Sequence, residues 1–446
     1  MKIKKTTLNL RAAAAVAFPF AIAAASLSPR EAHAYGESVS GFPSWAERVM
    51  HQWSNRARAD PQLEMSKCGQ NCGEAACYSP VGPLYWDEKL NRAARFHSAN
   101  MASIGFFAHD SKCTLVKNIG LLYPDSCAGD ASCACEGGQP QCSGSCTSFF
   151  DRVALFGASP AGEIIASPSD PDQAFYLWLY EPAASKDCGF TLQNGHRFLI
   201  LTSGPSVGYG TVQASVGDFG GSGGSHKIPS GSHYPQQAGE VEAWASWLDG
   251  AGPSLAMINV DGACSPMSLG RGKAEDGSYK ATVSNVGAGC HRYYFVFKDA
   301  TGQKVTYPET GSLGIGGADC ADWDPTKPAE GAGCDCAPSC SGVQCGDDGC
   351  GGMCGMCGAG ETCQGGMCVP GDGPSGGAGG GGGPTGGGGA GGSGGDNIDP
   401  DDTEGDEGGC ACRTAGGPDE PSALSIIALL GLAGAAATRR RGRARE

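Results

Sequence analysis

The first half of the chain contains apolar residues at helical spacing. The first stripe of this kind consists of Trp45, Val49, Trp53 and Ala57. Ser44 precedes the stripe and Glu47 follows three residues later, which is the pattern of a capping box at the start of a helix. Pro61 ends the pattern, because proline cannot donate the backbone hydrogen bond that a helix interior needs. The sequence therefore predicts a helix that begins after Ser44.

Two later stretches also predict helices. The second helix begins near Asp87 and ends near Gly105, and its inner face is apolar except for His97, which we expect to be a core histidine. The third helix has Asp170 as its N-cap and Pro171 at the first helical position. Because the third helix is apolar on nearly every side, we expect it to be buried.

Strand patterns follow these helices. Residues Arg197–Thr202 and Val207–Ser215 are rich in β-formers, whereas residues 217–238 are rich in Gly, Ser and Pro and are expected to form a linker. In residues 239–322 the predicted strands are Leu255–Val260, Tyr279–Ser284, Tyr293–Lys298 and Lys304–Tyr307. Helices first and strands after indicate an α+β domain over residues 35–216, followed by a small β-sandwich.

The composition narrows the classes of function. The chain has 446 residues with 75 Gly, 27 Pro and 24 Cys, and its net charge is −15. Such a length corresponds to about three domains, and the glycines indicate linkers between them. An acidic surface repels phosphate backbones, so we exclude nucleic acid as a partner. This many cysteines indicate disulfides in an oxidising compartment.

The cysteines fall into separate groups. Ten lie in residues 35–216, and six of these are in an insertion, residues 112–148. Their even number favours disulfides, with a zinc cluster at Cys133 and Cys135 as the alternative. In the β-sandwich we expect a bridge between Cys264 and Cys290. Residues 323–368 hold nine cysteines and too few apolar residues for a core, which predicts a disulfide knot whose ninth cysteine has Cys320 as an available partner.

Both ends of the chain have targeting patterns. Basic residues precede an apolar run and the A-x-A site that ends at Ala34, so residues 1–34 are predicted to be a secretory signal peptide. Residues 369–409 are a Gly-rich tether, expected to be disordered, with a root-mean-square reach of about 35 Å. Residues 410–446 form a tail in which the apolar segment 421–437, predicted to cross a membrane, is followed by an arginine cluster.

The tail combines a cysteine-containing motif, a short apolar segment and an arginine cluster. Gly409-Cys410-Ala411-Cys412-Arg413 precedes the apolar segment and the arginines, and residues 409–446 resemble the MYXO-CTERM sorting tail of myxobacterial surface proteins. The resemblance implies that a sorting protease processes the tail near Cys410 or Cys412. It also implies membrane attachment through the tail, at the cell surface or outer membrane. The alternative is a plain C-terminal transmembrane anchor.

Four polar residues at the edges of predicted elements are candidates for a site. They are His109, Glu163, Glu181 and His196. Each residue taken alone is more often structural than functional. Their significance depends on whether the fold brings them together.

Residues 44–214 resemble the CAP superfamily, which comprises the cysteine-rich secretory, antigen 5 and pathogenesis-related proteins and is also called the SCP domain. The matching motifs, in chain order, are Asn55-x-x-Arg58, Pro83-Leu84-Tyr85-Trp86-Asp87, the segment around His109, Arg152, Gly157, Gly162-Glu163-Ile164-Ile165, Trp178-Leu179-Tyr180-Glu181, Gly195-His196-Arg197 and Val207-Gly208-Tyr209-Gly210. The resemblance implies a CAP-type α-β-α sandwich. It also implies that His109, Glu163, Glu181 and His196 form a cleft that binds Zn²⁺ or another divalent cation.

The chain departs from the family pattern at three places. Ile164 replaces the usual Asn in the Gly-Glu-Asn-Ile motif, which removes a polar group beside the cleft. The insertion 112–148 follows His109, and a second insertion, Leu63–Val81, lengthens the loop after the first helix. These departures affect which ligand or substrate the cleft would accept more than they affect the fold.

Three classes of function remain open at this stage. Because many CAP domains bind sterols, lipids or proteins, the resemblance favours a non-enzymatic binding module for an extracellular lipid, glycan or protein. The second class is a metal-dependent hydrolase of peptides or envelope polymers, with a glutamate as base. The third is a structural or adhesive surface protein. A hydrophobic groove that the four residues do not line would favour lipid binding.

Overall fold

The computed structural model describes residues 43–68, 71–142, 146–183, 185–237, 239–331, 334–335, 342–346, 354–355, 357–358, 361–370 and 411–414. The predicted signal peptide, nearly all of the tether and the apolar segment 421–437 lie outside these residues. Within the described ranges, none of the helices has the length and apolar character needed to span a bilayer.

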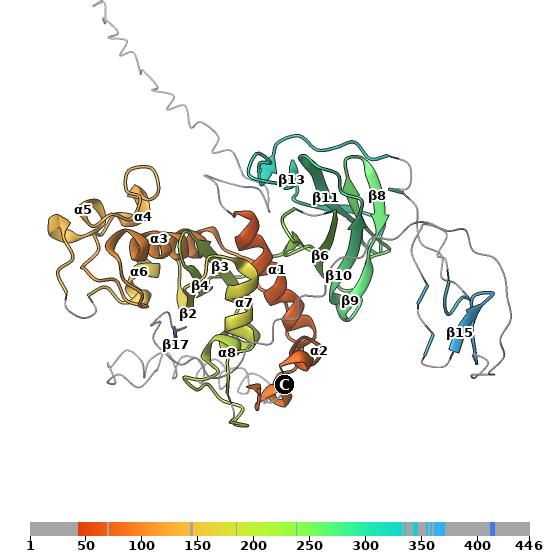
Figure 1. The fold of residues 1–446 in the computed structure, drawn as a ribbon, viewed down its shortest axis with the longest axis horizontal. Helices are drawn as coiled ribbons and strands as arrows, with labels where there is room; N and C mark the ends of the chain where they lie inside the picture. Colours follow the sequence, from red (N-terminus) through yellow and green to blue (C-terminus); the bar gives the residue numbers. More distant parts are fainter. Residues whose placement is uncertain are drawn as a thin grey trace, which may run out of the picture. The chain divides into compact units, whose positions relative to one another are not determined.

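Residues 43–220 form an α/β region, in which helices surround one sheet (Figure 1). Its helices are α1 (Trp45–Ala59), α2 (Pro61–Glu64), α3 (Glu88–Ile104), α4 (Ile119–Leu122), α5 (Ala131–Ala134), α6 (Phe149–Leu155), α7 (Pro171–Leu179) and α8 (Gly195–Thr202). Its strands are β1 (Tyr85–Trp86), β2 (Pro160–Ala166), β3 (Ser206–Thr211) and β4 (Ser215–Gly220). The mixed α+β class is therefore confirmed.

The three predicted helices are confirmed, and their caps explain their starting points. The Ser44 hydroxyl accepts a hydrogen bond from the backbone N–H of Glu47, and the Glu47 carboxylate accepts one from the backbone N–H of Ser44. The carboxylate of Asp87 caps α3 and that of Asp170 caps α7. Helix α3 ends at Gly105, whose φ of 77° is in the left-handed region that glycine adopts without strain.

The predicted strand Arg197–Thr202 is wrong, because these residues belong to α8. The segment is rich in β-formers, but Leu199, Ile200 and Leu201 are all buried in the core that α1 and α7 share. Tertiary packing of this kind overrides local strand propensity. The error concerns the site directly, since α8 carries His196 in its first turn.

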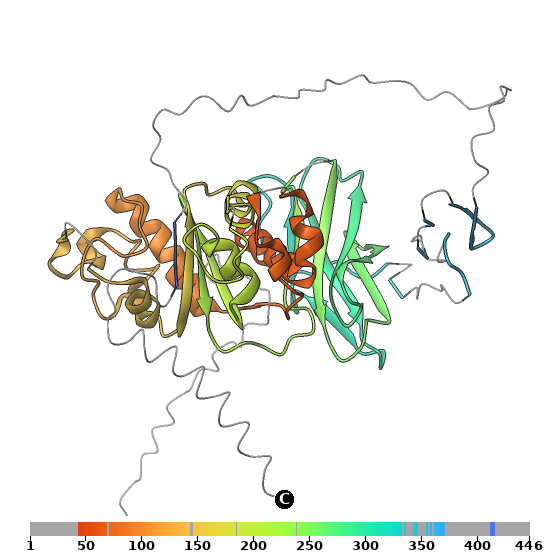
Figure 2. The ribbon, with the colours of Figure 1, turned by 90° about the horizontal axis from the view of Figure 1, so that it is seen from below.

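The sheet order is β1-β3-β4-β2-β17, where β17 (Ala411–Thr414) pairs with β2. Only β1 and β3 are parallel among these neighbours. On one face, α3 approaches β3 so closely that a Cβ added to Gly210 would lie 2.2 Å from the backbone nitrogen of Arg95. Tyr209 points to the other face, where its hydroxyl lies 2.7 Å from that of Ser54 in α1. Helices therefore cover both faces of this sheet (Figure 2).

Residues 228–324 form a β region with two packed sheets. The strand orders are β5-β6-β10-β9 and β14-β13-β11-β7-β8, with β12 paired to β11. The strands are β5 (Gly231–Tyr234), β6 (Glu240–Leu248), β7 (Leu255–Val260), β8 (Ala263–Pro266), β9 (Ser268–Gly272), β10 (Asp276–Ser284), β11 (His291–Lys298), β12 (Lys304–Tyr307), β13 (Ser312–Ile315) and β14 (Trp323–Asp324). Buried aromatic side chains such as Trp247, Tyr293 and Phe297 fill the space between the sheets.

The four strands predicted in this region are confirmed, but the expected linker 217–238 carries two strands. Residues 217–220 complete β4, which lies between β3 and β2. Residues 231–234 form β5, which pairs with β6. Small residues suit both places because the backbone is closely packed there: Gly217 is enclosed by Tyr209 and Ile164. In residues 217–238 the Gly-rich composition therefore reflects strands packed closely against their neighbours, where a linker was expected.

Helix α1 is buried on almost every side, because it contacts the α/β sheet and the β region. The indole N–H of Trp45 donates to the carbonyl of His233 at 2.9 Å. The Gln52 amide donates to the Ser246 hydroxyl at 3.1 Å and accepts from Ser230 at 2.6 Å. The α/β region and the β region thus share a buried interface that the predicted domain boundaries did not anticipate.

All ten cysteines expected to pair in the α/β region do so. The bridges are Cys68–Cys72, Cys77–Cys188, Cys113–Cys135, Cys127–Cys133 and Cys142–Cys146. The zinc alternative at Cys133 and Cys135 is therefore not supported. Such a density of disulfides indicates an extracellular or otherwise oxidising location.

The expected Cys264–Cys290 bridge is wrong. Cys264 lies on β8 at one edge of its sheet and pairs with Cys334, whereas Cys290 precedes β11 and pairs with Cys320. Strand β7 separates β8 from β11, so the two expected partners lie two strand spacings apart. The sequence offered Cys320 as the partner of the ninth cysteine of the knot. In the structure the knot cysteine that pairs outside residues 323–368 is Cys334, and its partner is Cys264.

The described part of the knot contains a short hairpin, and two disulfides join cysteines that are both described. Strands β15 (Glu361–Gln364) and β16 (Met367–Pro370) pair with each other. The disulfides are Cys345–Cys363 and Cys357–Cys368. Because the hairpin is largely exposed, the disulfides are its main stabilising feature.

Candidate functional site

His109 and Glu163 form the first of two buried histidine–glutamate pairs. Nδ1 of His109 donates to Oε1 of Glu163 at 2.7 Å, and Nε2 of His109 is buried without a hydrogen-bond partner among the described residues. Glu163 lies on β2, and His109 lies in the loop after α3. His97 of α3 holds this loop, because its Nε2 donates to the carbonyl of Ala108 at 2.7 Å. His97 is fully buried, as expected of a core histidine.

Arg152 of α6 binds both members of this pair. Its guanidinium donates to Oε2 of Glu163 and, at 2.7 Å, to the backbone carbonyl of His109. Burial alone would raise the pKa of Glu163, but the positive charge of Arg152, the nearby His97 and the hydrogen bond from His109 together outweigh burial and hold this pKa well below its usual range. Glu163 is therefore an ionised carboxylate whose two oxygens are both engaged.

A second buried carboxyl group, that of Asp218, lies beside Glu163. The two residues face each other across the β2–β4 pair, Asp218 is fully buried, and its carboxyl group lies within hydrogen-bonding reach of that of Glu163. Burial and the negative charge of Glu163 raise the pKa of Asp218 well above its usual value. Asp218 therefore keeps its proton to a higher pH than an ordinary aspartic acid does.

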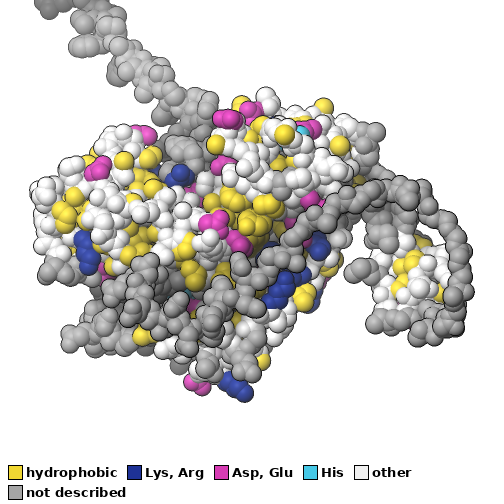
Figure 3. Space-filling model, in the orientation of Figure 1, with side chains coloured by type: hydrophobic (Ala, Val, Ile, Leu, Met, Phe, Trp, Pro, Cys, Tyr) yellow, Lys and Arg dark blue, Asp and Glu magenta, His cyan; other side chains and the backbone are white. Residues whose placement is uncertain are grey.

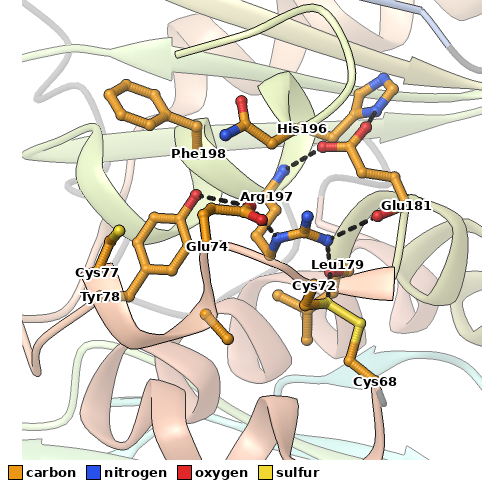
Figure 4. A network of polar contacts seen from close by, with 12 residues as sticks. Cys68, Cys72, Glu74, Cys77, Tyr78, Leu179, Glu181, His196, Arg197 and Phe198 are labelled. Carbon is orange, nitrogen blue, oxygen red and sulfur yellow. Dashed lines mark hydrogen bonds and ion pairs between the residues drawn. A yellow bond between two sulfur atoms is a disulfide. The ribbon is translucent and has the colours of Figure 1, made fainter. Parts of the chain in front are cut away.

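Glu181 and His196 form the second pair, shown in Figure 4. Nδ1 of His196 donates to Oε2 of Glu181 at 2.5 Å. The other carboxylate oxygen of Glu181 accepts the backbone N–H of Arg197 at 3.0 Å. Both residues are buried, with Glu181 immediately after α7 and His196 in the first turn of α8. As in the first pair, both oxygens of the glutamate are engaged.

Arg197 connects the second pair to the insertion Leu63–Val81 (Figure 4). Its Nε donates to Oε1 of Glu74 at 2.7 Å, and Tyr78 donates to the same oxygen at 3.2 Å. Another guanidinium nitrogen donates to the backbone carbonyls of Leu179 and Glu181 at 2.7 and 2.9 Å. Burial and the negative charge of Glu74 raise the pKa of Tyr78.

The structure therefore pairs His109 with Glu163 and His196 with Glu181. Among the described residues, the four do not include a group of three whose ligating atoms lie within 4.8 Å of one another. The set that meets this condition in the described chain is Cys345, Cys357 and Cys368, which could hold a metal ion by position. In this structure each of these cysteines is in a disulfide, so none offers a thiolate.

An apolar hollow lies at the C-terminal end of α3. Its volume is about 400 Å³, and its lining residues are Met101, Ala102, Gly105, Phe106, Phe107, Ser167, Gln213 and Ala214. None of the four predicted site residues lines it. A hollow of about 700 Å³ in the β region is lined mainly by backbone and small side chains near the Cys290–Cys320 bridge. Both volumes fall within the usual range of small-ligand pockets.

Charged groups are dispersed over the described part of the face that Figure 3 shows. On the face in Figure 3, acidic and basic side chains occur in small groups between apolar ones, and the described part of this face has no continuous basic patch. A nucleic-acid interface needs such a patch.

Sequence reasoning did not place Glu74, Arg152, Arg197 or Asp218 in the site. Arg152 and Arg197 belong to the quoted motifs, so their nearness to predicted site residues was a usable signal. Glu74 lies in an insertion and Asp218 in the expected linker, where no local pattern indicates a buried carboxyl group. No protein-family model matches the chain, and no curated protein is similar enough to count as a relative.

Proposed function

We propose that this protein is an extracellular, non-enzymatic binding module whose ligand site lies in the α/β region. The observation that carries this proposal is that Glu163 and Glu181 each have both carboxylate oxygens engaged. A general base in hydrolysis needs an oxygen that can take a proton from water. Each oxygen of the two glutamates already accepts a hydrogen bond from a histidine, an arginine or a backbone N–H. This arrangement therefore favours ligand binding over hydrolysis.

The two pairs support a divalent-cation site of modest affinity. In many metal sites a histidine donates one ring N–H to a carboxylate, which orients the other ring nitrogen toward the ion. His109 meets this condition, because Nδ1 is bonded to Glu163 and Nε2 is buried without a partner in the described structure. His196 is bonded to Glu181 through the same nitrogen. Two imidazoles would hold Zn²⁺ more weakly than the three protein ligands of catalytic zinc sites.

The hollow beside α3 supports an apolar ligand, such as a lipid chain, over a glycan. Met101, Phe106 and Phe107 supply an apolar lining, and Phe106 and Phe107 come just before His109 in the chain. Its volume suits part of an acyl chain. A CAP-type cleft next to an apolar hollow is the arrangement that we propose for the α/β region, with attachment of the protein to the cell surface through its tail.

Two alternatives remain as outcomes of the test. A metal-dependent hydrolase would require Glu163 or Glu181 to leave its present partner in the presence of substrate. A structural or adhesive protein would use the α/β region as a scaffold braced by five disulfides.

The metal site is tested by titrating the full-length protein with Zn²⁺ in a calorimeter. We expect one Zn²⁺ per chain in the wild type and none in the double variant His109→Ala/His196→Ala. The matched control is His226→Ala/His291→Ala, because these two histidines also pair through Nδ1 with carboxylates, those of Glu309 and Asp261 in the β region, but are more exposed than His109 and His196. Equal loss in both double variants, or no binding in the wild type, contradicts the metal site.

The apolar ligand is tested with a fluorescent fatty acid, cis-parinaric acid. We expect its fluorescence to rise with the wild type and not with Phe107→Asp, which places a charge in the hollow. The control is Leu121→Asp, because Leu121 is 87% exposed and does not line the hollow. Hydrolysis of peptides or envelope polymers that disappears in the histidine double variant would favour the hydrolase instead.

A further inference from the structure

The insertion Leu63–Val81 reaches the second histidine–glutamate pair from outside the motifs. Its backbone pairs with the chain just after Glu181, because Gly73 donates to the carbonyl of Ala183 at 2.8 Å and Ala183 donates to that of Asn71 at 2.7 Å. The Cys77–Cys188 disulfide ties the same insertion to the loop before α8. The insertion is therefore fixed to the segments on both sides of the pair.

Within this insertion, Glu74 is the partner that neutralises Arg197. Both side chains are essentially fully buried, and Oε1 of Glu74 lies 2.7 Å from Nε of Arg197. The Arg197 guanidinium also donates a hydrogen bond to the backbone carbonyl of Glu181. The backbone N–H of Arg197 donates a second one to the Glu181 carboxylate. One residue thus connects Glu74 to both the main chain and the side chain of Glu181.

The charge balance explains why Glu74 matters for His196. A buried guanidinium without a counter-charge is strongly destabilised, so it attracts a nearby carboxylate. If Glu74 were neutral, the other carboxylate that Arg197 already contacts is that of Glu181, which now accepts from Nδ1 of His196. The His196 ring would then lose the bond that fixes its orientation.

We propose that Glu74 is a positioning residue, which reserves the Glu181 carboxylate for His196 by neutralising Arg197. The chain thereby uses an insertion to set the orientation of a site residue that lies more than a hundred positions later. This inference rests on the proposed function only in assigning His196 to ligand binding. The Glu74–Arg197 contact itself is a feature of the fold.

The test uses the full-length protein with Glu74→Gln, which keeps the shape of the side chain and removes its charge. The matched control is Glu64→Gln, since the buried Glu64 also forms an ion pair with an arginine, Arg56 at 2.5 Å, and this pair includes neither Glu181 nor His196. Both variants should lose stability. The His196 Nδ1–H should give a low-field proton NMR signal, which is assigned because it is missing from the spectrum of His196→Ala. Only Glu74→Gln should lose this signal. Only Glu74→Gln should also weaken Zn²⁺ binding, by roughly 10- to 100-fold.

A Glu74→Gln protein that keeps the His196 signal, as the Glu64→Gln control does, overturns the proposal. If Glu74→Gln does not fold, Glu74→Asp serves in its place. The aspartate keeps the charge but is one methylene shorter, so the His196 signal should shift and Zn²⁺ should bind more weakly by about threefold or more. An unchanged signal and affinity in Glu74→Asp also overturn it. If the wild type binds no Zn²⁺, the metal site fails, while the NMR signal still decides the role of Glu74.

Discussion

Glu163 and Asp218 occupy directly opposed positions on β2 and β4, and both carboxyl groups are fully buried. Their environments drive their pKa values apart. Arg152, together with His97 and His109, lowers the pKa of Glu163 against the effect of burial, whereas burial and the charge of Glu163 raise the pKa of Asp218. Two neighbouring carboxyl groups therefore lose their protons at widely different pH.

This difference predicts opposite outcomes for two similar substitutions. Asp218→Asn should leave the protein at least as stable as the wild type at pH 7. The unfolded chain releases the Asp218 proton above about pH 4, which favours unfolding, and asparagine removes this effect. Near pH 4 the gain should vanish. Glu163→Gln should destabilise the protein by about 3–5 kcal/mol, because it leaves Arg152 buried without its counter-charge. Urea unfolding of both variants at pH 4 and pH 7 checks this. A large loss in Asp218→Asn at pH 7 would show that Asp218 is ionised.

Buried histidines predict how stability depends on pH. Burial lowers the pKa of His51 and His233 to about 4 and that of His97 to about 3, from 6.5 in the unfolded chain. Below pH 6.5 the unfolded chain therefore binds protons that the folded chain does not. Each residue should lower the free energy of unfolding by up to about 1.4 kcal/mol for each pH unit between about 6.5 and 4.

The measurement for this prediction is urea unfolding at half-unit steps from pH 7 to pH 4. Replacing His51 with Gln should reduce the slope of the free energy of unfolding against pH by about one proton, and the same holds for His233→Gln. Since the substitutions also change the absolute stability, the slope is the quantity to compare. A slope equal to that of the wild type in both variants would contradict the assignment of neutral buried histidines.

Local signals were sufficient for much of the fold. The capping residues Ser44, Asp87 and Asp170 mark helix starts by side-chain hydrogen bonds to nearby backbone, so their effect is visible within a few residues. The strands of the β region carry the apolar and β-branched residues that two packed sheets require. These features depend little on distant parts of the chain.

Long-range contacts account for the errors. The segment Arg197–Thr202 has strand-like composition, but α1 and α7 offer a buried surface to a helix. The partner of Cys264 depends on the strand order, which spacing does not reveal. At the site, the motifs identified both histidine–glutamate pairs, while Glu74 and Asp218 reach them only through the tertiary fold. Polar residues that support a site from outside its motifs are the hardest to find from sequence.

The two disulfides around Glu74 should differ in their effect on stability. Cys77–Cys188 joins residues 111 positions apart, whereas Cys68–Cys72 joins residues 4 apart. In the chain-entropy view, removal of the first should cost about 4–5 kcal/mol and removal of the second about 2 kcal/mol. Thermal unfolding of Cys77→Ala/Cys188→Ala and Cys68→Ala/Cys72→Ala compares them. Equal losses would indicate that strain or unfolded-state structure dominates over loop closure.

Gln52 provides a test of the interface between α1 and the β region. Its side chain is buried and bonds to the hydroxyls of Ser230 and Ser246, so Gln52→Ala leaves both hydroxyls with one partner fewer. A buried polar group that loses its partner costs about 1–3 kcal/mol. Gln62→Ala is the control, because Gln62 also bonds through its amide but is exposed. We expect Gln62→Ala to lower the free energy of unfolding by less than about 1 kcal/mol.

The interface also predicts a single unfolding transition for the two regions. Among the described residues the helices lie in the α/β region, so circular dichroism of helices reports on that region. The seven tryptophans are divided between the two regions, with Trp244, Trp247 and Trp323 in the β region, so their fluorescence reports on both. Because α1 packs against both sheets, the two signals should change at the same urea concentration, and Gln52→Ala should shift them together. Two separate midpoints in the wild type would mean that the regions fold independently and that their contact through α1 contributes little to stability.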